Sequence, residues 1–296
     1  MEGAVWGTSY HISYMCAENL SDSIIALMNE INESLSMFSP TSTVSHVNSG
    51  ETDSVDDHFI NVYNVARKVN AVSDGAFDPT VAPLVDLWGF GRNGRDTMFP
   101  DSTDVASALE KVGISRCSVA GQRIIKGHPE MEFDFSAIAK GYGVECIAEM
   151  LKRNACNDFM VEIGGEIQLA GYNPHGNIWH IQVDVPEPGL EPGDSALMIL
   201  EITDCAIATS GNYRNYRKTT TDSIISHTIN PVTGYPAPCH MLSATVIAHG
   251  CTEADALATA LMASPAENAS KIMQHFPMSK AIIVLPSGRT IIVEPN

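Results

Sequence analysis

Two oxygen-bearing side chains four residues apart, Asp255 and Thr259, are the clearest candidates for chemistry in this chain. They interrupt an otherwise apolar helical pattern over residues 251–262, which predicts a helix buried nearly all round. Residues four apart on a helix point the same way, and a lone buried carboxylate is costly. A hard cation would satisfy it, because Mg²⁺ accepts carboxylate, hydroxyl and carbonyl oxygens and usually keeps room for substrate phosphate.

The same segment has an interpretation that needs no metal. Thr252 has the residue type of a helix N-cap, and Asp255 stands three residues later, where a capping box places an acid. This segment alone leaves both interpretations open.

A candidate anion site lies between Asp134 and Gly143, where a strand end is expected to pass into a helix. Unpaired amides and the positive end of the helix dipole attract anions there, and Lys140 adds a formal charge. Asp134 is better suited to accept hydrogen bonds from ribose, adenine or main-chain donors. The alternative is that Asp134 caps the helix and Lys140 is a solvated first-turn lysine.

His227 stands among small polar residues just before a proline turn, and it is a candidate general base. A hydroxyl nucleophile needs a proton acceptor whose pKa lies near the working pH. The turns at residues 76–80 and 164–166 would let backbone approach a flat ligand closely. The polar loop 212–217 could contact a ligand or a partner protein. Each feature also has an ordinary structural explanation.

Composition limits the class of protein. The chain has 296 residues, 44% of them hydrophobic, enough for one large domain or two closely joined halves. The net charge of −18 argues against a nucleic acid or an anionic membrane as the main partner. An anionic substrate therefore needs a divalent cation, a well-placed Lys or Arg, or backbone amides.

The seven cysteines have no C-x-x-C spacing and cannot all pair, so we expect neither a zinc ribbon nor a dense disulfide framework. Most are expected to be small core residues. No apolar run approaches the roughly 20 residues that span a bilayer, and the first residues lack the features of a signal peptide. We expect the chain as given to be soluble, although a targeting segment could have been trimmed.

The hydrophobic periodicity predicts an α+β fold, because strands and helices mix without strict alternation. Helices are predicted around residues 24–35, 59–69, 105–112, 139–154, 251–262 and 266–276, with Gly113 as a C-cap. Strands are predicted at 5–14, 159–163, 180–185, 197–202, 206–209, 243–248, 281–285 and 290–293.

A set of motifs in order along nearly the whole chain resembles the FAD:protein FMN transferase family, the ApbE-type flavin transferases. The motifs are Gly-Thr-Ser-Tyr at 7–10, Gly-Ala-Phe-Asp-Pro-Thr-Val at 75–81, Leu-Trp-Gly-Phe-Gly at 87–91, Asp-Phe-Ser-Ala-Ile-Ala-Lys-Gly-Tyr at 134–142, Ile-Gly-Gly-Glu at 163–166, Ala-Thr-Ser-Gly-Asn-Tyr at 208–213, Ser-His-Thr-Ile-Asn-Pro-Val-Thr-Gly at 226–234 and Ala-Asp-Ala-Leu-Ala-Thr-Ala-Leu at 254–261. One departure is Trp6, where the family often has Met.

The resemblance implies one compact α+β domain over residues 1–296, ApbE-like and T-fold-like, with a flavin cleft. It implies that FAD is bound with Mg²⁺ and that its FMN half is moved onto a threonine hydroxyl of a target protein, releasing AMP. The acceptor would be a membrane redox-complex subunit, with no nucleic acid involved. Relatives of this kind are often periplasmic or lipid-anchored, although no signal for either is visible here.

The resemblance also implies roles for individual residues. Asp255, Thr259 and the main-chain carbonyl of Ala137 would hold the metal, and His227 would be the base. The FAD site would be lined by Phe38, Ala76, Phe77, Asp78, Asp134, Lys140, Gly164, Gly165 and the main chain at Ile229.

Two other functions use the same residues. Water in place of the threonine would make a Mg²⁺-dependent FAD pyrophosphatase that yields FMN and AMP, and a protein without turnover would simply bind or store FAD.

Overall fold

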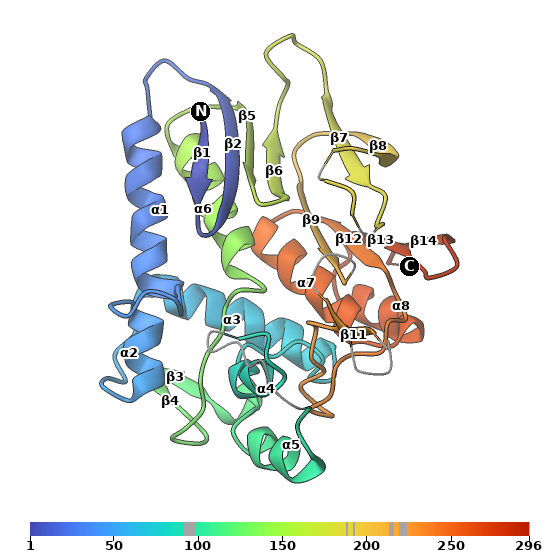
Figure 1. Cartoon of the computed structure of the whole chain (residues 1–296). Helices are drawn as coiled ribbons and strands as arrows, with labels where there is room; N and C mark the ends of the chain where they lie inside the picture. Colours follow the sequence, from blue (N-terminus) through green and yellow to red (C-terminus); the bar gives the residue numbers. More distant parts are fainter. Residues whose placement is uncertain (92–98, 188, 192, 213–215, 219–223, 296) are drawn as a thin grey trace.

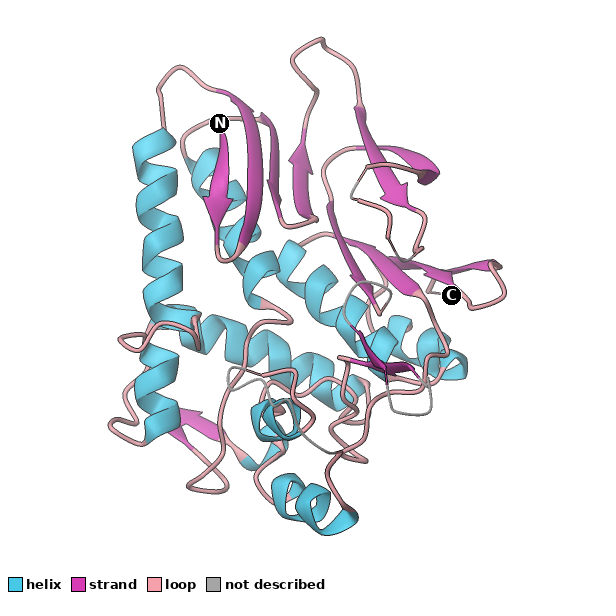
Figure 2. Cartoon of the chain, viewed as in Figure 1, coloured by secondary structure: helices cyan, strands magenta, loops and turns pink. Residues whose placement is uncertain are grey.

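A single antiparallel sheet of eight strands organises the molecule, in the order β1-β2-β5-β6-β9-β12-β13-β14 (Figures 1 and 2). The computed structural model describes residues 1–91, 99–187, 189–191, 193–212, 216–218 and 224–295. The sheet strands are β1 (Glu2–Val5), β2 (Thr8–Met15), β5 (Asp158–Ile163), β6 (Glu166–Ala170), β9 (Ala206–Gly211), β12 (Ser243–Ala248), β13 (Lys280–Val284) and β14 (Thr290–Val293).

Shorter strand pairs and the helices pack around this sheet. The pairs are β3 (Ser118–Ala120) with β4 (Arg123–Ile125), β7 (Trp179–Asp184) with β8 (Ala196–Ile202), and β10 (Tyr216–Lys218) with β11 (Ile224–Ser226). The helices are α1 (Ser21–Leu35), α2 (Thr43–Ser49), α3 (Asp57–Val72), α4 (Ala82–Leu87), α5 (Ser102–Leu109), α6 (Ala139–Arg153), α7 (Cys251–Ala263) and α8 (Ala269–Met273), with 3-10 turns at Ile114–Arg116 and Ala266–Asn268. The prediction of an α+β fold is confirmed.

Helix α7 lies near the centre of the molecule beside α6 (Figure 1), and it contacts β9, β12 and α3 as well. Its buried residues come from every side of the helix, as predicted from its apolar sequence. The largest core cluster surrounds it and extends from Ile12 to Val293. This continuity supports the prediction of one domain over residues 1–296, which remains a prediction.

The first predicted strand, 5–14, is confirmed at residues 8–14, which lie in β2, but it starts too early because the chain turns back before Thr8. Trp6 and Gly7 both have positive φ angles, 50° and 78°, and they form the turn of the β1–β2 hairpin. The Trp6 indole donates a hydrogen bond to the Met28 carbonyl at 3.3 Å. Its ring lies so close to Gly143 of α6 that a Cβ there would be 2.2 Å from it. The hairpin is thereby fixed to α1 and α6.

The predicted helix 105–112 is displaced along the chain. Asp101 and Asp104 form a capping box, which starts α5 at Ser102, and the helix ends at Leu109. Gly113 is therefore not its C-cap but precedes the 3-10 turn Ile114–Arg116. The capping box was not recognised in the sequence, and it decides the start of the helix.

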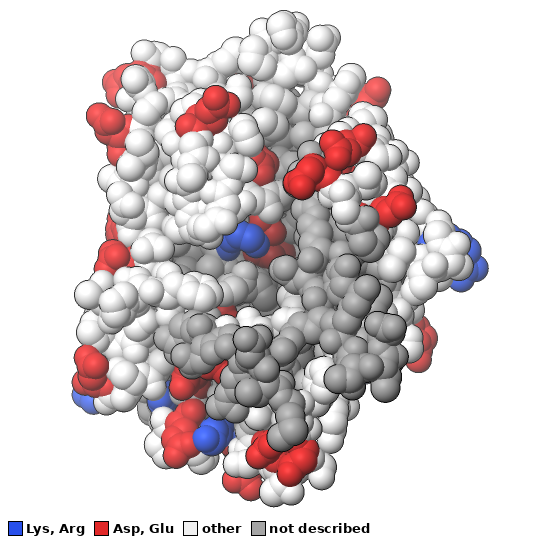
Figure 3. Space-filling model, viewed as in Figure 1, with Lys and Arg blue, Asp and Glu red and all other residues white. Residues whose placement is uncertain are grey.

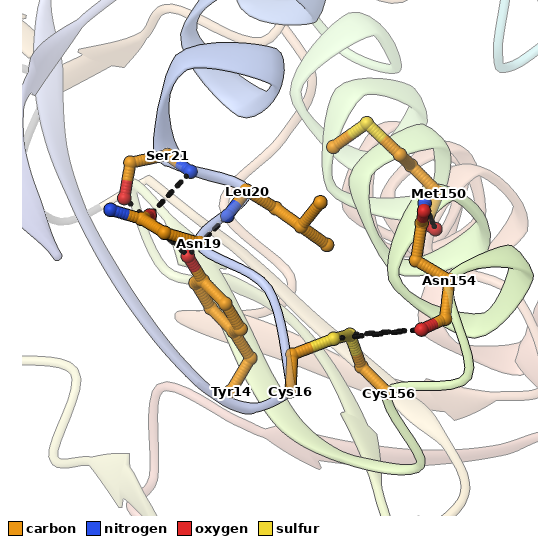
Figure 4. The surroundings of a disulfide bond; sticks show 8 residues. All are labelled: Tyr14, Cys16, Asn19, Leu20, Ser21, Met150, Asn154 and Cys156. Carbon is orange, nitrogen blue, oxygen red and sulfur yellow. Dashed lines mark hydrogen bonds between the residues drawn. A yellow bond between two sulfur atoms is a disulfide. The ribbon is translucent and has the colours of Figure 1, made fainter.

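Two cysteines, Cys16 and Cys156, form a disulfide (Figure 4), which was not predicted, although Cys156 is buried in the core as expected of most cysteines. Antiparallel pairing of β2 with β5 places Met15 opposite Asp158, which brings the two cysteines together at the end of the ladder. Their Cα atoms are 5.0 Å apart although they are 140 positions apart in sequence. Spacing along the chain carries no sign of this pair.

Among the helices of the described residues, none combines the length and the apolar character that crossing a membrane requires.

Candidate active site

The predicted metal ligand Asp255 sits where α7 crosses the start of α6. Its Oδ2 accepts a hydrogen bond from the Gly141 amide at 3.0 Å. A Cβ at Gly141 would lie 2.4 Å from the Cys251 carbonyl oxygen and 2.6 Å from the Asp255 Cβ, so this crossing requires glycine. Asp255 is 3% exposed, and among the described contacts its Oδ1 has no hydrogen-bond partner. One carboxylate oxygen is thus held by α6 and the other is left for a ligand.

The interpretation of Thr252 and Asp255 as a capping box is wrong. The N-cap of α7 is Gly250, and no side chain of the helix itself caps it. The Thr252 amide and hydroxyl instead donate to Oε2 of Glu145 on α6, at 2.9 and 2.6 Å. Since a residue from another helix satisfies the first turn of α7, Asp255 is not needed for that purpose.

An ion pair between partly exposed Lys140 and buried Glu166 adjoins this crossing. Lys140 Nζ donates to Glu166 Oε1 at 2.9 Å, while Glu166 Oε2 is buried with no hydrogen-bond partner. Burial raises the pKa of Glu166, although the Lys140 charge acts in the opposite direction. Burial would lower the pKa of Lys140, but the charges of Asp255 and Glu166 outweigh it and raise that pKa above its usual value. Lys140 is therefore a cation held by an ion pair at a partly exposed position, rather than a freely solvated lysine.

The side of α7 that carries Asp255 makes further polar contacts along the helix. The Thr259 hydroxyl lies 3.0 Å from the Ser210 hydroxyl of β9. One turn further, the Ala263 carbonyl accepts a hydrogen bond from Asn230 Nδ2 at 3.1 Å. Positions 255, 259 and 263 follow one side of the helix. This side of α7 therefore holds α6, β9 and the His227 loop in fixed relative positions.

The loop that carries His227 is a compact turn. Asn230 Oδ1 accepts hydrogen bonds from the amides of Val232 and Thr233, and Ile229 pairs with Pro236 in an isolated bridge. The His227 ring packs edge-on against Phe90, with centroids 6.4 Å apart. Ile229 is buried in a small cluster with α4 and α5, as befits a residue predicted to offer only its main chain.

The predicted FAD-lining turn at residues 76–80 is held from inside by Asp78. Asp78 Oδ1 accepts hydrogen bonds from the amide and hydroxyl of Thr80, and Oδ2 accepts them from the Ile114 amide and Asn70 Nδ2. Burial raises the pKa of Asp78 more than these bonds lower it. With both oxygens used, the Asp78 side chain is not left for a ligand. The main chain of Phe77 is also used, since its amide donates to Ser73 Oγ and its carbonyl accepts from Asn70 Nδ2.

Asp134 lies beside that turn, because its amide donates to the Pro79 carbonyl at 2.6 Å. Its Oδ1 accepts from the Ser136 amide at 2.8 Å. The N-cap of α6 is Ile138, so the interpretation of Asp134 as the helix cap is wrong. Ala137, whose carbonyl is the third predicted metal ligand, comes directly before this N-cap.

Three further predicted positions lie at turns. Gly164 and Gly165 join β5 to β6 with φ angles of 61° and 96°, which glycine adopts without strain. Phe38 follows α1 and is 70% exposed, so its ring is available for stacking. Trp6, by contrast, uses its indole to pack on Gly143 and to bind the Met28 carbonyl.

The charge around these elements is mainly acidic. Figure 3 shows acidic side chains scattered over one face and a hollow near its middle where basic atoms lie against acidic ones. Within the described parts of the chain, no group of three or more His, Cys, Asp or Glu is arranged to hold a metal. The predicted set has a single carboxylate with a hydroxyl and a carbonyl, which suits an ion that also binds substrate phosphate.

Comparisons with known proteins identify the family. A profile of the ApbE family matches residues 6–283. The chain belongs to the ApbE family. Its relatives include the FAD:protein FMN transferase of Vibrio cholerae, 36% identical over 294 residues (96% of this chain, 86% of that protein). The protein of the same name from Haemophilus influenzae is 30% identical, with 96% of this chain and 86% of that protein covered.

Solved ApbE structures share the fold. The flavin transferase ApbE from Vibrio cholerae superposes with a TM-score of 0.86 at 33% identity, covering 99% of this chain and 96% of the other. The ApbE protein from Thermotoga maritima gives a TM-score of 0.87 at 27% identity, with 99% and 96% covered.

Three contributors to the site of this ApbE family member were not predicted from its sequence. Gly141 and Glu145 lie within or just beyond a recognised motif, but their roles depend on the crossing with α7. Glu166 belongs to the predicted turn 164–166 and to the motif at 163–166, but its ion pair with Lys140 was not predicted. A charged residue next to a glycine pair was the one available signal for it.

Proposed function

We propose that this protein transfers the FMN half of FAD onto a threonine hydroxyl of an acceptor protein and releases AMP. Membership of the ApbE family and the activity for which the relatives are named support the transferase class. The observation that carries the proposal here is Asp255, a buried carboxylate with one oxygen bound by α6 and one unpartnered. A carboxylate in that condition is suited to a ligand that arrives with the substrate.

The residues of the crossing fit a magnesium ion. Asp255 Oδ1, the Thr259 hydroxyl and the Ala137 carbonyl are hard oxygen donors, and Mg²⁺ prefers such donors together with substrate phosphates. When bound, the ion would neutralise charge on the diphosphate of FAD. The Ser210 hydroxyl, 3.0 Å from that of Thr259, orients this ligand from β9.

The remaining groups have complementary tasks. Lys140 supplies a fixed positive charge at the start of α6 for an anionic substrate in an acidic protein. His227 accepts the proton of the acceptor threonine on a ring nitrogen. The threonine oxygen forms a bond to the FMN phosphorus, the bond from that phosphorus to the bridging oxygen breaks, and the electron pair leaves with AMP.

An assay of AMP release separates this function from its alternatives. Protein, FAD and Mg²⁺ are mixed with and without a threonine-containing acceptor peptide. We expect AMP to appear in proportion to flavinylated peptide and at most slowly without it. Many turnovers without acceptor would establish the pyrophosphatase instead, and bound FAD with no AMP under either condition would establish a binding protein.

We also propose that the chain works outside the reducing cytoplasm, as a periplasmic or membrane-anchored protein whose acceptor is a subunit of a membrane redox complex. The Cys16–Cys156 disulfide supports an oxidising compartment. Thiol labelling of the unfolded chain, isolated from its native cells without reductant, tests this. Protection of these two cysteines is expected, whereas labelling of both would contradict the proposed compartment.

A further inference from the structure

Asn212 has an unusual hydrogen-bonding state immediately after β9. The side chain is 7% exposed, and its Oδ1 accepts a hydrogen bond from the Thr228 hydroxyl at 2.7 Å. Its main-chain amide continues the sheet by donating to the Leu242 carbonyl. The side-chain Nδ2 is buried with no hydrogen-bond partner. An amide held rigidly at one end and unsatisfied at the other is costly to keep.

The chemical character of this atom separates it from the other orphaned polar atoms. Among buried side-chain atoms in the described part of the chain, Nδ2 of Asn212 is the one donor without a partner, and the rest are oxygens such as Glu166 Oε2 and Gln168 Oε1. Folded proteins satisfy nearly all buried donors, and a persistent exception needs an explanation. A ligand that supplies an acceptor oxygen provides one.

Neighbouring residues connect this donor to the predicted metal ligand Thr259 and to the predicted base His227. Alternate residues of a strand face the same side, and Ser210 of β9 faces α7 through its contact with Thr259. Asn212, two residues later, continues that face. Its partner Thr228 directly follows His227. The Asn212 side chain therefore lies on the strand face of Ser210, which contacts the predicted metal ligand Thr259, and it is hydrogen-bonded to the residue that follows the predicted base.

We propose that Asn212 Nδ2 donates a hydrogen bond to a non-bridging oxygen of the FAD diphosphate, at the phosphorus that the acceptor threonine attacks. This inference rests on the proposed function and assigns a substrate-binding residue to it. Asn212 adds a neutral, oriented donor beside the positive charge of Lys140. The Thr228 hydroxyl fixes the amide plane before substrate arrives, so that little reorganisation is needed.

The test compares Asn212→Asp, Asn212→Ala and the control Asn29→Asp, which makes the same chemical change at an exposed position of α1. We expect both Asn212 variants to release AMP about 10²-fold more slowly, as for removal of an oriented donor. FAD affinity, measured by flavin fluorescence with Mg²⁺, should fall about tenfold in Asn212→Asp, because a carboxylate replaces the donor and repels phosphate. The control should match the parent protein in both measurements.

The Asp variant is decisive because it keeps the shape of the side chain but replaces the free donor by an acceptor. Turnover and FAD affinity within about threefold of the parent would overturn the inference, at the scale of a lost neutral hydrogen bond. If the parent itself releases no AMP, the proposed function fails, and FAD affinity alone then judges Asn212. If Asn212→Asp does not fold, Thr228→Val, which only frees the amide plane, should slow AMP release about tenfold, and an unchanged rate would overturn the inference.

Discussion

Two groups of half-buried or buried acids in this molecule differ in how many of their oxygens the protein satisfies. Asp56 accepts hydrogen bonds on both oxygens from Ser34, Thr43 and the Phe59 amide. We call Asp56 and Asp78 the structural acids. Asp78 also uses both oxygens, as described above. In the site, Glu166 has one oxygen bonded to Lys140 and the other buried without a partner. Asp255 has one oxygen bonded to the Gly141 amide, and its other oxygen has no hydrogen bond among the described contacts.

The difference teaches that burial alone does not identify a functional acid. A carboxylate whose lone pairs are all taken by protein donors stabilises local structure and has nothing left to offer a ligand. A buried carboxylate with a spare oxygen carries an unfavourable free energy that a bound cation or donor can relieve. The comparison therefore predicts opposite consequences when each acid, or the backbone that holds it, is altered.

Among changes that leave every charged side chain in place, the largest effect is expected when the crossing that holds Asp255 is disturbed. Gly141→Ala places a methyl group 2.4 Å from the Cys251 carbonyl, so α6 and α7 must separate and the Asp255 carboxylate must move. We expect flavin transfer to fall about 100-fold or more, since misplacement by about 1 Å has that cost. Gly143→Ala in the same helix is the control, because its methyl group meets the Trp6 ring instead of Asp255. Equal loss of transfer in the two variants, measured as steady-state rates, would break the comparison.

Asp78 is a structural acid at a position that the resemblance also assigns to the FAD site, so its substitution tests which role it has. Asp78→Asn turns an amide NH₂ toward donors, and we expect the free energy of unfolding to fall by about 1–3 kcal/mol. Chemical denaturation measures this value. Unchanged stability together with lost FAD affinity would instead show that the Asp78 side chain binds the ligand and would contradict its structural role.

Asp56 is a structural acid away from the site, so its substitution should change stability without changing flavin transfer. Asp56→Ala removes the N-cap of α3, and the expected loss is about 1–2 kcal/mol in the free energy of unfolding. The rate of flavin transfer at a temperature where the variant stays folded should not change. A fall in that rate without a fall in stability would show that this acid is not purely structural.

The smallest expected effect is the loss of the stability contribution of Asp56 at low pH. Burial acts to raise the pKa of Asp56, but hydrogen bonds from Ser34, Thr43 and the Phe59 amide outweigh it and hold the pKa below its usual value. A group with a lowered folded-state pKa contributes stability above its unfolded pKa of about 3.9, and this is lost as pH falls through the folded value.

Between pH about 5 and about 3 the parent protein should therefore lose more stability than Asp56→Ala. Denaturation curves at the two pH values measure the difference. Equal losses in both proteins would mean that this carboxyl does not have a lowered pKa.

The sequence predicted the parts of the site that depend on local pattern. Apolar spacing identified α7 and placed Asp255 and Thr259 on one side of it, and helical periodicity located α1, α3 and α6 closely. The order of motifs identified the family because it extends over nearly the whole chain.

Long-range contacts could not be predicted in this way. Glu145 satisfies α7 across 107 positions, and Gly141 meets Asp255 across 114. The disulfide joins residues 140 apart. Asn212 was expected in a polar loop that could contact a ligand, yet it is buried, and the rest of that loop at 213–215 lies outside the described residues. None of these contacts leaves a pattern in neighbouring residues.

The most direct test of the account is transfer of FMN by Asp255→Asn. Asparagine keeps the shape and can still accept the Gly141 hydrogen bond, but it removes the charge that a divalent ion requires. Mass spectrometry of an acceptor protein after incubation with FAD and Mg²⁺ measures the added FMN. We predict a loss on the order of 10³-fold relative to the parent protein, since a catalytic metal supplies several kcal/mol, and full dependence of the parent on added Mg²⁺. Transfer by Asp255→Asn at the parental rate would contradict the central claim.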